Sequence, residues 1–299
     1  MIDRLHRRGF LQVAGAAAGS MCVNLRGASG PVEGDASAHP RFLTGCCAYS
    51  YGDYLKSGKM TMEDFIRKAV ELEIDAVDIT TYWLKSTEPD YLLSLRHLAF
   101  KLGVLFSGIA IRNSLCYADA DKRTQQVEEI KKWVDATETL GTSQIRVFGG
   151  KIPNGATDAQ GIDWVVETLK PACDYAAKKG VTLAIETHHE ITEKAANVVE
   201  ILRRVDSPYA AVTLDVSNWL EEPYGQIETL VPYATNTHIR DFYGPPPRPL
   251  DLDRVWQIFA KAGYKGFMTV EYENKEDQMT GVPKLVEQVK ALCKKYSSV

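Results

Sequence analysis

The sequence predicts an α/β protein that folds as a single (β/α)8 barrel, a TIM barrel of eight parallel strands inside a ring of helices. Short apolar runs that suit strands alternate eight times with amphipathic stretches that suit helices, from residue 42 to the C-terminus. No hairpin signal interrupts this alternation, so each strand should connect to the next through a helix. Eight such units are the number that closes a barrel, which typically needs about 250 residues.

The expected elements follow one another in a regular order. The strands are expected at 42–48, 75–80, 104–111, 143–149, 181–187, 210–215, 235–240 and 267–272. The helices are expected at 61–73, 88–102, 121–140, 158–179, 192–205, 225–233, 251–262 and 279–296. Thr61 and Asp64 have the spacing of a capping box at the start of the first helix. Left-handed C-caps are expected at Gly103, Gly141, Gly180 and Gly263. The prolines at 245–247 predict a stiff loop after the seventh strand.

The first 38 residues predict a twin-arginine signal peptide rather than part of the barrel. Arg7 and Arg8 precede a weakly apolar stretch over 13–23, and Ala36-Ser37-Ala38 offers a cleavage site of small residues. The mature domain would cover 39–299 and would be periplasmic or otherwise extracytoplasmic. A basic, poorly ordered tail is the alternative. No later stretch reaches the ~20 apolar residues that span a bilayer, so we expect no membrane partner after signal removal.

Composition excludes several classes of partner. The formal net charge is −4 and no basic run occurs, whereas clustered Lys and Arg set affinity for nucleic acids. We therefore expect a small-molecule substrate and no nucleic acid. Five cysteines remain beyond residue 38 without CxxC spacing, which is neither a zinc knuckle nor a disulfide framework. The oligomeric state is left open, and a homo-oligomer is compatible with the sequence.

Four consecutive strand candidates finish with a side chain that binds metals well. These side chains are Glu186, Asp215, His238 and Glu271. Alternate residues of a strand face opposite sides, so each shares its face with a small or polar residue two positions earlier. Those residues are Ala184, Thr213, Asn236 and Thr269. A barrel filled only for stability would place branched apolar residues there, so this half of the barrel is expected to surround a polar cavity.

Three carboxylates and one imidazole are suitable ligands for a single divalent ion. Because no thiolate is among them, we expect Mn2+, with Mg2+, Co2+ and Zn2+ as alternatives. Carboxylates that converge in a dry cavity would repel one another unless a cation neutralised them. The competing interpretation is that each acid forms a separate ion pair or helix cap.

At these strand ends the chain resembles the xylose isomerase-like family of TIM barrels, also described as sugar phosphate isomerases/epimerases. The motifs that carry the resemblance are Ile185-Glu186-Thr-His188, Leu214-Asp215-Val-Ser-Asn218, Thr237-His238-Ile-Arg240-Asp241 and Val270-Glu271-Tyr-Glu273. The resemblance implies that Glu186, Asp215, His238 and Glu271 hold one Mn2+ or a related ion. It also implies that Glu186 and Glu271 act as base and acid on a sugar or keto-sugar through an enediolate. Asn218 and Arg240 depart from the His and Lys that relatives often carry there.

Further residues are candidates for binding the substrate. His188, Asn218, Arg240 and Glu273 follow the strands that carry the ligands, and Tyr82, Trp83 and Arg112 follow the second and third strands. The alternatives are a loop histidine for His188, an ion pair with Asp241 or Glu273 for Arg240, and core or rim positions for the aromatic rings. Arg146 would face the barrel interior, either toward the mouth or toward Asp78 near the floor.

Three other functions compete with a metal-dependent isomerase or epimerase. A keto-sugar dehydratase or lyase of the same family is the nearest, because the same geometry permits β-elimination. An apurinic-site endonuclease shares the barrel but resembles a histidine-rich zinc site, and few histidines are available here. A non-catalytic exported sugar-binding protein would bind sugar with metal and show no proton exchange.

Overall fold

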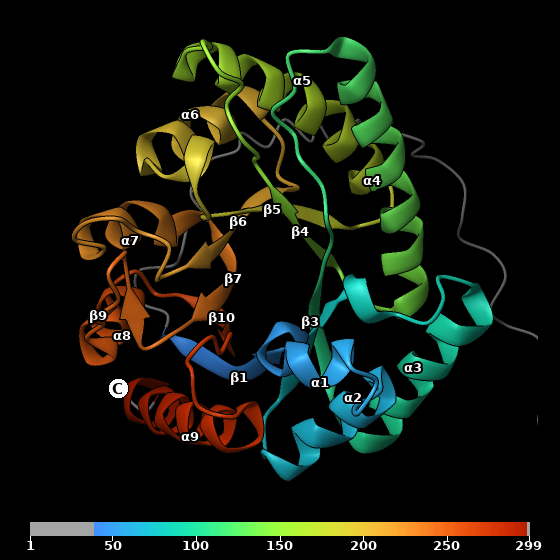
Figure 1. Ribbon diagram of the computed structural model, residues 1–299, viewed down its shortest axis with the longest axis vertical. Coiled ribbons are helices and arrows are strands. Elements are labelled where there is room, and N and C mark those ends of the chain that lie inside the picture. Colours follow the sequence, from blue (N-terminus) through green and yellow to red (C-terminus); the bar gives the residue numbers. More distant parts are fainter. Residues whose placement is uncertain (1–38, 298–299) are drawn as a thin grey trace, which may run out of the picture.

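The computed structural model describes residues 39–297 and shows a closed barrel of eight parallel strands surrounded by helices (Figure 1). The barrel strands are β1 (Arg41–Cys47), β2 (Ala76–Thr80), β3 (Leu105–Ala110), β4 (Gln144–Phe148), β5 (Thr182–Glu186), β6 (Ala210–Asp215), β7 (Ala234–Ile239) and β10 (Lys265–Val270). Neighbouring strands pair in parallel, and β1 closes the ring by pairing with both β2 and β10. The predicted (β/α)8 barrel is confirmed.

Each expected helix has a counterpart on the outside of the barrel. These are α2 (Met62–Glu71), α3 (Pro89–Leu102), α4 (Ala120–Leu140), α5 (Asp158–Ala177), α6 (Ala195–Val205), α7 (Tyr224–Leu230), α8 (Leu252–Lys261) and α9 (Gln278–Ser297). A short helix, α1 (Gly52–Lys56), follows β1 and was not expected. Thr61 and Asp64 form the predicted capping box before α2. The four expected C-cap glycines all have positive φ, between 66° and 86°.

The barrel strands place apolar side chains on the face toward the helices and polar side chains on the face inside the barrel. Leu183, Ile185, Val212 and Leu214 face the helices and are fully buried in the apolar core. The side chains inside the barrel are polar instead. Thr269 Oγ1 donates to Asn236 Oδ1 at 2.8 Å, and Asn236 Nδ2 donates to Asp78 Oδ2 at 3.0 Å. The expected polar interior is therefore present, and its hydrogen-bonded floor lies beneath the candidate ligands.

One hairpin departs from the expected pattern. The strands β8 (Phe242–Tyr243) and β9 (Arg248–Pro249) pair antiparallel after β7, and the prolines at 245–247 lie in the turn that joins them. The expectation that no hairpin would occur was therefore wrong. Each arm has only two residues, which is too short to show an alternating pattern in the sequence. The hairpin extends the chain over the barrel end where β7 finishes (Figure 1).

Two predictions concern the chain's location. The predicted signal peptide, residues 1–38, lies outside the described residues. Within residues 39–297, every helix is too short or too polar to cross a membrane. The five cysteines in the same range are buried and free of disulfide bonds.

Candidate metal centre

The four predicted ligands come from four neighbouring strands of the barrel. Glu186 ends β5, Asp215 ends β6, His238 lies near the end of β7, and Glu271 directly follows β10. One potential ligand atom from each residue lies within 4.8 Å of the others. All four side chains are buried. The spacing along the chain therefore predicted a real cluster in space, which has the dimensions of a single ion site.

His238 lies at the centre of this cluster. Its Nδ1 is 2.7 Å from Glu186 Oε1 and 3.5 Å from Glu271 Oε1. Within the described chain, His238 Nε2 and Glu186 Oε2 have no hydrogen-bond partner although both atoms are buried. Buried polar atoms normally form hydrogen bonds, so the lack of one at an atom of each of two candidate ligands fits a site that takes a cation.

Arg240 ties three carboxylates together at the mouth of the barrel. Its guanidinium lies 2.8 Å from Asp215 Oδ2, 2.7 Å from Glu271 Oε2 and 2.7 Å from Glu273 Oε2. The ion pair with Glu273 that the sequence allowed is therefore present, together with two others. Asp241 instead accepts a hydrogen bond from Asn274.

Arg146 provides the second buried positive charge of the site. Its Nε lies 3.5 Å from Glu186 Oε2, so Arg146 faces the mouth and not the floor. The interpretation that paired it with Asp78 was wrong, because Asn236 is the residue that donates to Asp78. Two guanidinium groups face four carboxylates, on Glu186, Asp215, Glu271 and Glu273. A divalent cation would balance these charges, which is a second reason why the donor set fits a metal ion.

Burial and neighbouring charges shift the pKa values of the cluster in different directions. Burial alone would raise the pKa of Glu186, but the charge of Arg146 and the contact with His238 lower it to about 2. Glu271 is buried too, and the charges of His238 and Arg240 lower its pKa. For Asp215 burial prevails over Arg240, helped by Glu271 and Glu186, and raises the pKa to about 7. Both glutamates are therefore anionic at neutral pH.

Asn218 supports the candidate ligand Asp215. Its Nδ2 donates to Asp215 Oδ2 at 2.7 Å and to the Thr187 carbonyl at 3.2 Å. The backbone N–H of Ser217 donates to the other oxygen of Asp215 at 2.8 Å. These contacts hold the Asp215 carboxylate in place. Contact between Asn218 and a substrate stays a prediction.

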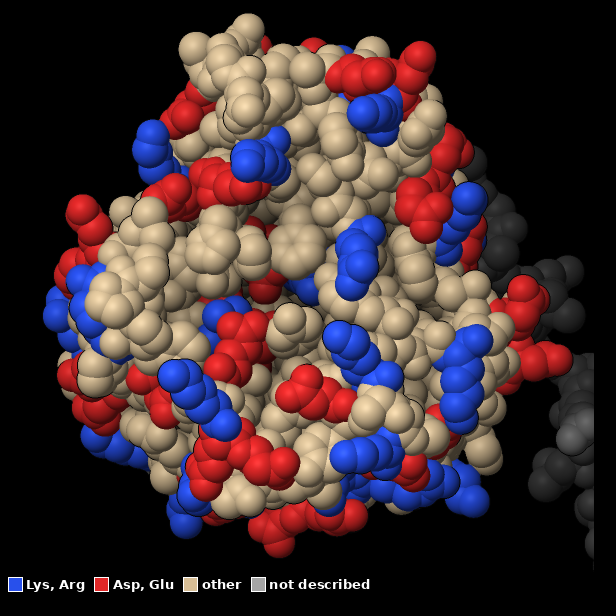
Figure 2. All heavy atoms as spheres, viewed as in Figure 1, with Lys and Arg blue, Asp and Glu red and all other residues tan. Residues whose placement is uncertain are grey.

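A cavity of about 220 Å³ adjoins the centre between the loop after β6 and the β8–β9 hairpin. Its lining includes His189, Ser217, Asn218, Trp219, Arg240 and Phe242. Figure 2, which shows the same face as Figure 1, has acidic and basic side chains inside the central hollow. A small polar molecule that entered here would meet Asn218 and Arg240 beside the candidate ligand Asp215.

The opposite side of the mouth carries aromatic rings. Phe148, which ends β4, has its ring 4.9 Å from the ring of His188, and the Arg146 guanidinium lies 3.9 Å above the Phe148 ring. Tyr82 and Trp83 have ring centroids 5.8 Å apart, and the exposed Arg112 covers Tyr82 at 4.5 Å. The predicted substrate-binding residues thus fall into two groups, an aromatic group and the polar group around Arg240.

Sequence reasoning missed Cys47 as a member of the centre. Cys47 ends β1, which lies next to β10 in the barrel, and its Sγ donates to Glu271 Oε1 at 3.8 Å. The rule that found the other four residues, a donor side chain at a strand end, also applies to Cys47. The ligand set drawn from the sequence contained no thiol, and Cys47 places one beside Glu271.

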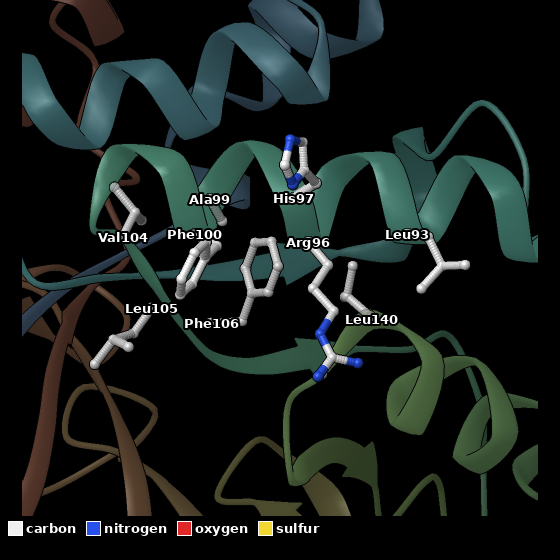
Figure 3. Close-up of a pocket in the computed structure, with 10 residues that line it drawn as sticks. Leu93, Arg96, His97, Ala99, Phe100, Val104, Leu105, Phe106 and Leu140 are labelled. Atoms are coloured by element: carbon white, nitrogen blue, oxygen red, sulfur yellow. The ribbon is translucent and has the colours of Figure 1, made fainter. Parts of the chain in front are cut away.

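A second depression lies away from this centre, beside α3 and the start of β3 (Figure 3). It measures about 390 Å³, and its lining includes Leu93, Phe100, Leu105 and Phe106 with Arg96 and His97. Among the residues described, no carboxylate lines it. Because catalytic side chains of such barrels lie at the carboxyl ends of the strands, the chemistry is expected at the mouth.

Comparisons with known proteins agree with the fold. A family model described as "Xylose isomerase-like TIM barrel" matches residues 66–295. A human protein named "Putative hydroxypyruvate isomerase" is 22% identical over 173 residues. The match covers 52% of this chain and 62% of that protein, so it spans less than two thirds of the relative's length.

Three solved structures are similar at low sequence identity. A D-psicose 3-epimerase crystallised in the presence of D-fructose has a TM-score of 0.69 and 15% identity, over 86% of this chain and 100% of that one. The IOLI protein with a bound zinc atom has a TM-score of 0.69 and 16% identity, over 85% and 99%. The probable 3-DHS dehydratase AsbF from Bacillus anthracis has a TM-score of 0.64 and 15% identity, over 84% and 97%. At these identities the likeness concerns the fold.

Proposed function

Because the chain belongs to the xylose isomerase-like TIM barrel family, we propose that it is a divalent-metal-dependent isomerase or epimerase of a sugar or keto-sugar. The convergence of Glu186, Asp215, His238 and Glu271 within 4.8 Å is the observation that carries the proposal. These residues would hold the ion. A bound divalent cation would supply Lewis acidity that polarises a substrate carbonyl. The D-psicose 3-epimerase and the zinc-containing relative support this assignment.

Glu186 and Glu271 are the proposed acid and base. They lie on β5 and β10, with β6 and β7 between them, so they approach the mouth from two sides. Their lowered pKa values keep both anionic at neutral pH, so each has a carboxylate free to accept a proton from the carbon beside the carbonyl, and each is a weaker base than an exposed glutamate. Removal of this proton by one carboxylate converts the substrate into an enediolate. Return of a proton to the other carbon gives an isomer, and return to the opposite face of the same carbon gives an epimer.

Neighbouring residues hold these carboxylates in place. Arg146 lies beside Glu186, and Arg240 bridges Glu271 and Asp215, so each glutamate has a fixed positive partner. His188 packs against Phe148 next to Glu186, where the two rings could bind one face of a sugar. Arg240 and Asn218 line the cavity on the other side. A substrate hydroxyl there would lie close to both the acid/base pair and the proposed ion.

A dehydratase or lyase acting on a keto-sugar is the second candidate. The likeness to the probable 3-DHS dehydratase favours it, since the same proton abstraction can be followed by β-elimination. Product mass separates the two reactions. Dehydration lowers the mass by one water, whereas isomerisation conserves it apart from hydrogen exchange.

The test is a screen of free keto-sugars and aldoses in heavy water, with ion-free protein and with added Mn2+. We expect deuterium at the carbon beside the carbonyl, and loss of at least about 100-fold in rate for Glu186→Gln and Glu271→Gln. Glu190→Gln is the matched control, because Glu190 is exposed in the segment after β5. Full turnover in both buried variants would refute the acid/base assignment.

The proposal also includes export of the protein by the twin-arginine route. The pattern Arg7-Arg8-Gly9-Phe10-Leu11 supports it, together with the small residues at 36–38. Replacing both arginines by lysine should keep the protein in the cytoplasmic fraction of a bacterial host. Equal extracytoplasmic recovery of the variant and the wild type would contradict this route.

A further inference from the structure

We propose that Cys47, His238 and Glu271 form a second ligand set, which overlaps the four-residue centre and takes a thiophilic divalent ion such as Cd2+, Zn2+ or Co2+. The inference rests on the metal-binding part of the proposed function and is independent of the reaction and its substrate. The two sets share His238 and Glu271, so they are alternatives. One bound ion would use either the Cys47 thiol or the pair Glu186 and Asp215.

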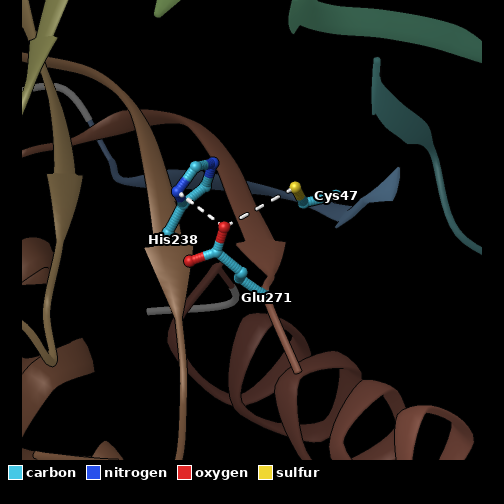
Figure 4. A group of neighbouring side chains, drawn as sticks. All are labelled: Cys47, His238 and Glu271. Atoms are coloured by element: carbon cyan, nitrogen blue, oxygen red, sulfur yellow. Dashed lines mark hydrogen bonds and ion pairs between the residues drawn. The ribbon is translucent and has the colours of Figure 1, made fainter. Parts of the chain in front are cut away.

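The geometry brings the three residues together at the β1 side of the barrel. One potential ligand atom from each of Cys47, His238 and Glu271 lies within 4.8 Å of the others, and all three side chains are buried. Figure 4 shows the thiol and the imidazole on opposite sides of the Glu271 carboxylate, with both directed toward its Oε1. Sulfur, nitrogen and oxygen donors thus converge on one position.

An independent observation at His238 points to a ligand. The Nδ1 atom of its ring is engaged with Glu186, whereas the buried Nε2 lacks a hydrogen-bond partner among residues 39–297. A nitrogen in this position costs free energy unless something pairs with it. The Nε2 atom therefore leaves His238 with a ring nitrogen that an ion could take as a partner.

The thiol changes which ions the site would prefer. Thiolate is a soft ligand that selects zinc-like ions, whereas carboxylates and water suit Mn2+ and Mg2+. When the ion binds, the S–H bond of Cys47 breaks, its proton goes to solvent and a sulfur lone pair binds the ion. The preference for Mn2+ drawn from the sequence assumed that no such ligand was present.

The test uses cobalt as a spectroscopic probe in the full-length, ion-free protein. Adding Co2+ should produce a near-ultraviolet sulfur-to-cobalt charge-transfer band, and Cys47→Ser should lose it. Cys173→Ser is the matched control, since Cys173 is a buried thiol on α5 whose Sγ contacts the Tyr209 carbonyl. Affinity for Cd2+ should fall at least about tenfold in Cys47→Ser, with affinity for Mn2+ unchanged within about twofold.

X-ray absorption of the zinc-loaded wild type provides a measurement that needs no variant. We expect one sulfur scatterer at about 2.3 Å from the ion. Bound cobalt or zinc with only oxygen and nitrogen neighbours would overturn the thiol set and leave the four-residue centre intact. A band that persists in Cys47→Ser would overturn it too. If the protein bound none of these ions, both the second set and the proposed metal dependence would fail.

Discussion

Arg240→Met tests whether the carboxylates at the barrel mouth are arranged to bind a cation. In the ion-free protein, Arg240 supplies positive charge to these carboxylates. The substitution removes the guanidinium and keeps most of the aliphatic length, so the packing volume changes little. Arg240 is buried and contacts Asp215, Glu271 and Glu273. Removing it from the ion-free protein takes a positively charged partner from two buried carboxylates, those of Asp215 and Glu271.

The magnitude follows from the burial of these partners. Breaking a buried ion pair on one side typically costs about 3–5 kcal/mol, because the remaining charge is uncompensated. In a domain of this size each kcal/mol of lost stability lowers the melting temperature by about 2–4 °C. We therefore expect the melting temperature of ion-free Arg240→Met to be roughly 10 °C lower than that of the wild type. A divalent ion should replace the lost charge. Stabilisation by a ligand at 100 times its Kd is about 2.7 kcal/mol, so saturating Mn2+ should recover much of the loss.

The assay is thermal and urea unfolding of both proteins, ion-free and with Mn2+. Arg203→Met is the control, because Arg203 forms an exposed pair with Glu200 three residues earlier on α6. Such pairs contribute about 0.5 kcal/mol or less. We expect the Mn2+-induced gain in stability to be larger in Arg240→Met than in the wild type. An ion-free variant within about 1 kcal/mol of the wild type, or an equal Mn2+ gain in both, would refute the reasoning.

Three further predictions concern pH, metal removal and local structure. Because burial raises the pKa of Asp215 to about 7, a proton competes with the ion below that pH. Burial alone would lower the pKa of His238, but the charge of Glu271 raises it, so this candidate ligand must also lose a proton before it binds an ion. Mn2+ affinity by calorimetry should therefore fall by at least about tenfold per unit as pH drops below 7; a flat profile would contradict this. Dialysis against a chelator should silence turnover, and Mn2+ or Co2+ should restore it, whereas a full rate after chelation would exclude a metal-dependent reaction. Thr61→Ala removes the capping box of α2 and should cost about 1 kcal/mol in urea unfolding, with no change in metal affinity.

The fold could be predicted because its determinants are local. Each strand and helix carries its own periodicity, and eight repeats leave few ways to bury all the apolar faces. The orientation of the ligands was equally accessible, since parity along β5 alone places Glu186 and Ala184 on one face and Ile185 on the other. The four candidate ligands lie close together for the same reason, because parallel strands bring their carboxyl ends to one rim.

The ion pairs inside the mouth could not be predicted in the same way. They depend on the stagger between strands, and the register shifts between Val77 and Asp78 and between Val212 and Thr213 leave no mark in the sequence. Arg146 could have reached either end of the barrel by parity. In the structure Arg146 pairs with Glu186, which its long side chain reaches, whereas Asp78 accepts a hydrogen bond from Asn236.

The residues at the ends of the eight barrel strands give the mouth a polar side and an apolar side. Polar side chains follow one another over six strands, at Glu186, Asp215, His238, Glu271, Cys47 and Thr80, and Cys47 lies 3.6 Å from the hydroxyl of Thr80. The two remaining strands end at Ala110 and Phe148. A sugar has hydroxyl-bearing edges and apolar C–H faces, so it could turn its hydroxyls toward the carboxylates and a C–H face toward Phe148. Because both the rim and a sugar have a polar side and an apolar side, the rim favours a sugar over a uniformly charged substrate.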